Sequence, residues 1–268
     1  MTDLEPELRI ALAAFAARPR VLVALDFDGT LSPFVLDPLQ ARAVPGGIEA
    51  LRSAAAFDGV TVAVVSGRDL ATLAALTDIG ADDGITLIGS HGAETNVATD
   101  TPGADFLDAE ATARLSVVSA ELEAIRARYP AVRLEHKPSA VVLHTRGVGA
   151  SVAEAATAAA LEVGERYPGV HVMPGKNVVE LTVVEANKGS AVLRLARATG
   201  SEATMYVGDD VTDEHAFAAL DTASGDLTVK VGEGETVAAQ RVPDPASVVE
   251  LLELFVSERR ADERPGRG

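Results

Sequence analysis

The sequence has no cysteine. It therefore has no disulfide framework, no zinc site built from thiolates and no cysteine nucleophile, and the redox compartment is left open. Positive charge is also scarce, because 23 basic residues stand against 40 acidic ones and give a formal net charge of −17. We therefore expect no long-range attraction to nucleic acid or to an anionic membrane surface, so local groups must hold any anionic substrate.

The chain also lacks a long apolar run. Its first residues, Met1–Glu7, have neither the basic nor the apolar region of a signal peptide, and no stretch is long enough to span a bilayer. We expect a cytoplasmic protein, a monomer with neither a membrane nor a nucleic-acid partner. At 47% hydrophobic residues the chain can bury a full core. The charged end from Ser257 to Gly268 predicts a frayed tail.

Short apolar runs alternate with helical patterns in the first and last parts of the chain. Such runs are typical of buried strands, and their alternation with helices predicts a parallel, doubly wound α/β sheet. Ligands bind beyond the carboxyl ends of the strands in such sheets, which is where the polar clusters of this sequence stand. The predicted strands are Val21–Leu25, Val60–Val65, Ile85–Ile88, Thr204–Val207 and Leu227–Val231, and the predicted helices are Leu4–Phe15, Gly46–Ala56, Ala71–Leu76 and Ser190–Thr199.

The middle of the chain, residues 106–184, has a different order of elements. A helix followed by two strands occurs twice there, and turn signals at Pro138-Ser139 and Pro174-Gly175 separate the strand partners. This αββαββ pattern predicts an antiparallel sheet with helices on one face. We predict a cap domain at 106–184, inserted into a catalytic core formed by 1–105 and 185–268.

Two carboxylates, Asp26 and Asp28, stand two residues apart directly after the first predicted strand, in Asp26-Phe27-Asp28-Gly29-Thr30. This arrangement suits one small hard cation with a nucleophile beside it. An acidic turn is the plainer interpretation. A calcium loop is another, but it needs a preceding helix, and here a strand precedes the motif.

Two further segments follow the same plan. Ser66-Gly67-Arg68 offers a hydroxyl and backbone N–H groups at a strand-to-helix turn, which suits phosphate oxygens, although a helix N-cap by Ser66 explains it equally well. Lys188 lies in the first turn of a helix, where the macrodipole disfavours a cation unless an anion is near. A solvated lysine is the alternative at that position.

The segment Gly208–Glu214 holds four acidic residues in six positions after another predicted strand. Such charges repel one another unless a cation or a lysine compensates them. An acidic helix N-terminus is the alternative, but the position at the end of a strand favours a metal site. All four segments are predicted at the same edge of one sheet, and together they offer a nucleophile, metal ligands, a phosphate cradle and a countercharge.

These four segments resemble the ordered motifs of the haloacid dehalogenase superfamily of aspartate-dependent phosphohydrolases. The resemblance implies a Rossmann-like parallel-sheet core with an inserted α+β cap. It also implies that Asp26 is the nucleophile and Asp28 the general acid and base, with Mg²⁺ held by Asp26, Asp28 and Asp209. Ser66, Gly67 and Lys188 would then bind the phosphoryl group, and Thr30, Asp210 and Asp213 would support the site.

The chain resembles the trehalose-6-phosphate phosphatase family more narrowly. Segments that fit the family pattern are Gly89–Glu94, Leu134–Lys137, Leu143–Arg146, Gly175–Glu180 and Asn187–Gly189. One departure is Thr182-Val183, where many members have Arg-Pro. The family implies that the substrate is a sugar phosphate, contacted by Arg68, His91, Gly92, Glu135, Lys137 and Glu180.

Other functions remain open from the sequence. Without the family pattern, Glu135, Lys137 and Glu180 are more typical of solvated strand faces than of a sugar-binding site. A phosphatase for sucrose phosphate or mannosyl-phosphoglycerate, a phosphomutase, and a non-catalytic sugar-phosphate sensor are the alternatives to a trehalose 6-phosphate phosphatase.

Overall fold

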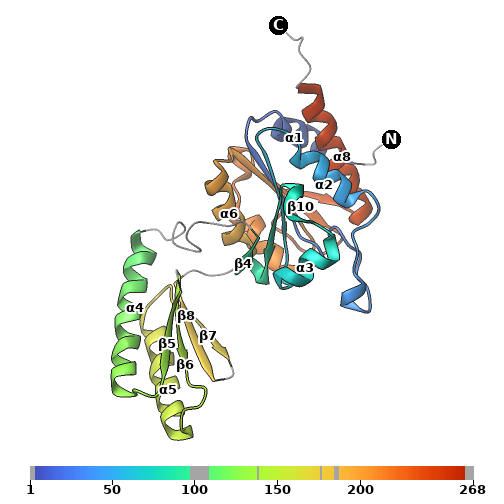
Figure 1. Cartoon of the computed structure of the whole chain (residues 1–268). Coiled ribbons are helices and arrows are strands. Elements are labelled where there is room, and N and C mark those ends of the chain that lie inside the picture. The colour runs from blue at the N-terminus through green and yellow to red at the C-terminus, as the bar shows by residue number, and fades with distance from the viewer. Residues whose placement is uncertain (1–3, 97–108, 138, 176, 184–186, 263–268) are drawn as a thin grey trace. The chain divides into compact units, whose positions relative to one another are not determined.

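The computed structural model describes residues 4–96, 109–137, 139–175, 177–183 and 187–262 (Figure 1). The chain divides into two compact units, one formed by Met1–Val97 with Ala186–Gly268 and the other by Ala98–Glu185. The predicted domain boundaries at 105/106 and 184/185 lie outside the described residues. The division into a core and a cap at those positions therefore stays a prediction.

Seven strands of the first unit form one sheet. They are β1 (Val21–Leu25), β2 (Val60–Val65), β3 (Ile85–Gly89), β4 (Glu94–Thr95), β9 (Ala203–Gly208), β10 (Leu227–Val231) and β11 (Gln240–Val242). Their order is β11-β10-β9-β1-β2-β3-β4, and all neighbours are parallel except β3 and β4. β1, β3, β9 and β10 are buried along their whole length, so apolar residues dominate their sequences.

Helices cover both faces of this sheet, because alternate side chains of a strand point to opposite faces. On β1, Val21 and Val23 belong to the apolar cluster that includes the inward faces of α1, α2, α3 and α8, whereas Leu22 and Ala24 pack in the cluster with α6 and α7. The predicted doubly wound α/β fold is confirmed. The helices are α1 (Pro6–Ala16), α2 (Gly47–Ala55), α3 (Leu70–Thr77), α6 (Lys188–Thr199), α7 (Glu214–Ala219) and α8 (Pro245–Asp262), with 3₁₀ turns at Pro38–Gln40, Ala81–Asp83, Ser90–Gly92, Val211–Asp213 and Thr222–Ser224.

The second unit has a four-stranded antiparallel sheet of its own. Its elements are α4 (Ala109–Arg128), β5 (Arg133–Lys137), β6 (Ala140–His144), α5 (Ala150–Arg166), β7 (His171–Gly175) and β8 (Val178–Thr182). The strand order is β5-β6-β8-β7, and a separate apolar cluster joins the sheet to α4 and α5. The predicted αββαββ order is confirmed.

The C-terminal segment differs from the sequence prediction. α8 continues to Asp262, so residues 257–262 belong to a helix and the prediction of a frayed tail from Ser257 onward is wrong for them. The cause is Arg259, a buried side chain that donates hydrogen bonds to the backbone oxygens of Ala16, Arg18 and Asp58. In the part of the chain that the structure describes, no helix combines the length and apolar character needed to cross a membrane.

Candidate active site

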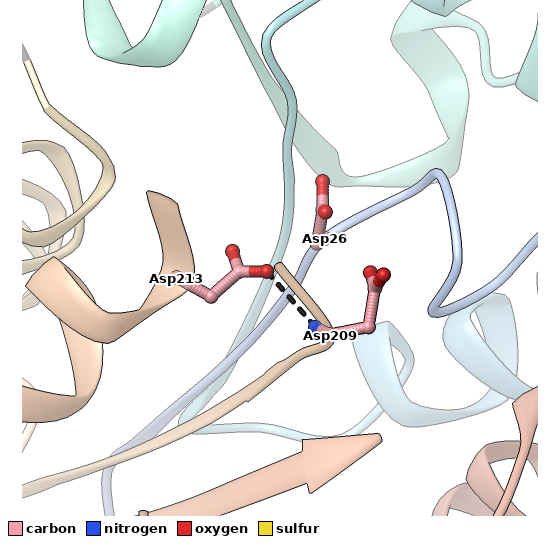
Figure 2. Close-up of side chains that lie close together, drawn as sticks. All are labelled: Asp26, Asp209 and Asp213. Carbon is pink, nitrogen blue, oxygen red and sulfur yellow. Dashed lines mark hydrogen bonds between the residues drawn. The ribbon is translucent and has the colours of Figure 1, made fainter. Parts of the chain in front are cut away.

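Polar side chains gather where three adjacent strands of the first unit end. β1 lies between β9 and β2, so Asp26, which follows β1, has Asp209 after one neighbour and Ser66 after the other. Figure 2 shows the side chains of Asp26, Asp209 and Asp213 close together. One carboxylate oxygen of each lies within 4.8 Å of the others, which is close enough for a shared metal ion.

Asp26 is buried, with only 4% of its surface exposed. Its backbone N–H donates to the carbonyl of Val207 on β9 at 2.9 Å, so the strand pairing itself fixes the residue. Oδ1 accepts a hydrogen bond from the N–H of Phe27 at 2.7 Å, and Oδ2 lies 2.9 Å from Nζ of Lys188. Burial raises the pKa of the Asp26 carboxyl to about 8, although the Lys188 ammonium opposes the rise. A bound cation at this carboxylate would favour its ionised form.

Lys188 begins α6 and is 3% exposed. Its ammonium lies between two carboxylates, 2.9 Å from Asp26 Oδ2 and 2.8 Å from Asp213 Oδ1. Burial disfavours the ammonium, but Asp26 and Asp213 outweigh that effect and raise the pKa of Lys188. The cation at this helix N-terminus, which looks anomalous in the sequence, is thus explained by two buried carboxylates, and the interpretation as a solvated lysine is wrong.

Asp213 has no exposed surface, and four donors occupy its two oxygens. Oδ1 accepts from Lys188 at 2.8 Å and from the hydroxyl of Tyr206 at 2.7 Å. Oδ2 accepts from the backbone N–H groups of Asp209 and Asp210, both at 2.9 Å. Asp213 therefore orients Lys188 and shapes the loop that carries Asp209, while its oxygens have little capacity left for a metal ion.

The carboxylate of Asp209 is more available to a metal ion than that of Asp213. Oδ1 accepts a hydrogen bond from the Thr30 hydroxyl at 3.0 Å, and burial raises the pKa of the group to about 6. Gly29 has φ +80°, and a Cβ there would lie 2.1 Å from Oδ2 of Asp209, so only glycine allows this approach. An all-oxygen set from Asp26 and Asp209 at this narrow place suits a hard divalent cation.

Lys230 on β10 is a residue that the sequence reasoning missed. It is 5% exposed, and its ammonium donates to the backbone carbonyl of Asp209. The one available signal was a charged residue inside the apolar run Leu227–Val231. Lys230 thereby anchors the loop after β9 from the neighbouring strand.

Asp28 and Arg68 form a bidentate ion pair. Nε of Arg68 lies 2.6 Å from Oδ2 of Asp28 and Nη2 lies 2.7 Å from Oδ1. The family resemblance implies a sugar contact for Arg68, whereas in the structure its side chain pairs with Asp28, the predicted acid and base. The pair fixes the orientation of the Asp28 carboxylate.

Ser66 and Gly67 form the turn after β2. The Ser66 hydroxyl accepts from the N–H of Arg68 at 3.2 Å, and it is Asp69 that caps α3, so the interpretation of Ser66 as a helix N-cap is wrong. A Cβ on Gly67 would lie 2.6 Å from the ring of His91, which shows how closely the imidazole covers this turn.

The predicted sugar-binding residues of the second unit share one face of its sheet. α4 and α5 pack on the face that carries Leu134, Leu143 and Leu181, so their strand neighbours Glu135 and Glu180 point to the other face. Lys137 on that face lies 2.7 Å from Glu180, and Glu135 lies 2.9 Å from His144. These pairs are partly exposed, as solvated strand faces also are.

A family model and curated relatives match most of the chain. The family model described as trehalose-phosphatase matches residues 24–245. A trehalose-phosphate phosphatase of Mycobacterium tuberculosis is 32% identical over 270 residues, covering 97% of this chain and 67% of its own length. A protein of the same species described as an uncharacterized glycosyl hydrolase is 37% identical over 248 residues, 87% of this chain and 18% of its own. A solved structure of trehalose-6-phosphate phosphatase from Aspergillus fumigatus aligns with a TM-score of 0.59 at 25% identity, covering 93% of this chain and 97% of that one.

Proposed function

Because the chain belongs to the trehalose-phosphatase family of the haloacid dehalogenase superfamily, we propose that it hydrolyses trehalose 6-phosphate to trehalose and phosphate through a phosphorylated Asp26. The observation that carries the proposal is the arrangement around Asp26. Its buried carboxylate lies at the end of the central strand, with the Lys188 ammonium on one oxygen and the Asp209 carboxylate within reach of a shared cation. The enzyme is a phosphomonoesterase.

The proposed reaction has two steps. An oxygen of Asp26 attacks phosphorus, the bond from phosphorus to the sugar oxygen breaks, and Asp28 gives a proton to that oxygen. Asp28 then accepts a proton from water, whose oxygen attacks the phosphorus of the aspartyl phosphate and releases inorganic phosphate. Asp28 enters the first step protonated, with one oxygen released from Arg68, and leaves it ionised. The bidentate pair with Arg68 holds that ionised carboxylate, which is the form that accepts the proton from water in the second step.

The residues around Asp26 would bind and neutralise the phosphoryl group. Ser66, Gly67 and Lys188 are the proposed contacts to its oxygens, and Asp213 keeps Lys188 in place. We propose Mg²⁺ as the cation, held by Asp26, the Asp28 backbone carbonyl and Asp209, with Thr30 and Asp210 in support. When bound, it would offset the negative charge of the transferring group.

Mg²⁺ should stabilise the protein more at high pH than at low pH. Burial raises the pKa of Asp209 to about 6 and that of Asp26 to about 8, so the folded protein favours their protonated forms. Without a cation, the stability that these two groups contribute is therefore fully present below about pH 4. It is lost as the pH rises through about 6 for Asp209 and about 8 for Asp26. A cation binds the ionised forms and reverses that loss. The measurement is the increase in unfolding temperature caused by Mg²⁺ at about pH 5 and about pH 8. Asp209→Asn should remove most of the increase, and an equal increase at both pH values would contradict the metal assignment.

Sugar recognition is proposed for two sets of residues. The first is Arg68, His91 and Gly92 in the first unit, and the second is Glu135, Lys137 and Glu180 on the helix-free face of the second unit's sheet. Polar side chains suit a hydroxyl-rich ligand, because each unpaired polar group at a closed site costs about 1–3 kcal/mol. His144 extends the second set, since it holds Glu135.

A panel of phosphate esters with Mg²⁺ tests the substrate. We expect trehalose 6-phosphate to have the highest kcat/KM and to release one inorganic phosphate per molecule consumed. A higher value for sucrose phosphate or mannosyl-phosphoglycerate would reject the sugar while leaving the enzyme class intact. Substrate loss without phosphate release would instead indicate a mutase, and binding without turnover a sensor.

Glu180→Gln should raise KM for trehalose 6-phosphate about tenfold or more, because one sugar contact and the partner of Lys137 are weakened together. The KM for a small aromatic phosphate, which offers no sugar hydroxyls, should change less than about twofold. Glu154→Gln, an exposed position on α5, is the matched control. Equal effects on both substrates would contradict a role in sugar recognition.

The other expectations from the sequence stay predictions. They are a cytoplasmic location, a monomeric state, and the absence of nucleic-acid and membrane partners. The strongly acidic composition supports the expectation about nucleic acid.

A further inference from the structure

Three consecutive residues after β3 adopt left-handed backbone conformations. The φ angles are +49° for Ser90, +55° for His91 and +109° for Gly92. Such a conformation costs a residue other than glycine about 1–3 kcal/mol and persists only where the surroundings enforce it. The hydrogen bonds that keep residues 90–92 in this conformation therefore point to the role of the turn.

The first set of contacts joins the turn to the proposed phosphate loop. The N–H of Ser90 donates to the carbonyl of Arg68 at 2.7 Å, and the N–H of His91 donates to the carbonyl of Ser66 at 3.0 Å. Glu94 bonds the Ser90 hydroxyl and accepts from the N–H of Leu70 at 3.1 Å. The turn and the phosphate loop thus form one hydrogen-bonded layer.

The second set comes from the helix that begins at Lys188. Nη2 of Arg194 donates to the carbonyl of Gly92 at 2.8 Å, and Nη1 donates to the Ser190 hydroxyl at 3.2 Å. Ser190 belongs to the capping box with Asn187 that starts α6. Arg194 therefore links the strained turn to the helix end that presents Lys188.

Together, these two sets of hydrogen bonds fix the position of the His91 imidazole. The His91 imidazole lies so close to Gly67 that a Cβ there would be 2.6 Å from two ring atoms. The side chain is otherwise exposed, so a ligand can reach it. Burial of part of the ring, followed by the nearby Lys188 ammonium, lowers the pKa of His91, which favours the neutral imidazole.

We propose that Arg194 is a positioning residue for substrate binding. By holding the carbonyl of Gly92 it keeps residues 90–92 in the strained turn, and so keeps the His91 ring over the phosphate loop. It acts through His91 on binding of the phosphate ester and leaves the phosphoryl transfer at Asp26 unchanged. This inference depends on the proposed function, because His91 is taken to contact the substrate.

A double-mutant cycle tests the proposal. Arg194→Met should raise KM about tenfold and change kcat less than about twofold. Arg194→Lys should restore most of the affinity, because an ammonium can still donate to Gly92. In a His91→Ala background, Arg194→Met should raise KM by less than about twofold. Arg197→Met, an exposed arginine on the same helix, is the matched control and should leave KM unchanged.

Two outcomes would overturn the proposal. One is a lowered unfolding temperature with unchanged KM in Arg194→Met, which would make Arg194 a purely structural brace. The other is an equal rise in KM with and without His91, which would mean that Arg194 does not act through the imidazole.

The cycle stays informative if the sugar assignment fails, because it can be run with whichever ester the panel identifies. A readout without turnover is the NMR signal of the His91 imidazole, titrated with inorganic phosphate. Arg194→Met should shift this signal and raise the Kd for inorganic phosphate, measured from the titration, about tenfold. Arg194→Lys and Arg197→Met should leave both the signal and the Kd nearly unchanged. An unchanged His91 signal in Arg194→Met would contradict the proposal whatever the substrate is.

Discussion

Turnover is expected to fall by at least about three orders of magnitude when Asp26 is replaced by asparagine. An amide cannot take over the attack on phosphorus, whereas its size and its bond from the Phe27 N–H can be retained. The measurement is phosphate release at saturating substrate and Mg²⁺. Asp82→Asn, at an exposed position on the first unit, should retain full activity.

Asp26→Asn should not lower the stability of the metal-free protein at neutral pH. Because burial raises the pKa of Asp26 to about 8, the native state favours an uncharged group at this position below that pH. We therefore expect an unfolding temperature equal to or above that of the native sequence. Inactivity together with a lower unfolding temperature would mean that the carboxylate is chiefly structural, and activity that survives would exclude it as the nucleophile.

Lys188→Met should cause the second largest loss of turnover. It removes the ammonium proposed to bind the phosphoryl group, and kcat should fall by at least about two orders of magnitude. Where Asp26 is ionised, at about pH 8, it also leaves Asp26 and Asp213 as buried carboxylates without their shared counter-ion, which costs about 3–5 kcal/mol of stability. The deficit should be larger at about pH 8 than at about pH 5, because Asp26, whose pKa burial raises to about 8, is protonated at the lower pH and then carries no uncompensated charge.

A double variant separates the two roles of Lys188. At about pH 8, where Asp26 is ionised, Lys188→Met with Asp26→Asn removes one of the two uncompensated charges, so the unfolding temperature should recover in part while activity stays absent. A single Lys188→Met variant with native stability at about pH 8 would contradict the description of the buried triad of Asp26, Lys188 and Asp213.

The sequence predicts the architecture of this protein well, because its signals are local. Apolar runs such as Val60–Val65 and Thr204–Val207 predict buried parallel strands, and a polar cluster follows each of them. Strand order and handedness then bring the carboxyl ends to one edge of the sheet. That is why Asp26, Ser66 and Asp209 could be expected near one another before any coordinates were known.

The side-chain partnerships could not be predicted in the same way. Lys230 meets Asp209 only because β10 lies beside β9 in one register, and Tyr206 meets Asp213 only because the loop after β9 folds back. The pairing of Arg68 with Asp28 likewise depends on the neighbouring positions of β1 and β2. Hydrophobic periodicity carries no information about such contacts.

The C-terminal end of α8 also could not be predicted from local sequence. Composition from Ser257 onward favours a frayed tail, yet Arg259 finds three backbone carbonyls and the helix continues. One long-range set of hydrogen bonds outweighs the local charge pattern there.

Chemical trapping on the first aspartate of the Asp26-Phe27-Asp28 segment tests the central claim most directly. Enzyme mixed with trehalose 6-phosphate and Mg²⁺, stopped with acid within one turnover and digested, should yield a peptide that carries a phosphoryl group on Asp26. Phosphate release at the normal rate with no phosphoryl group on that peptide, or with one on a different residue, would contradict the account.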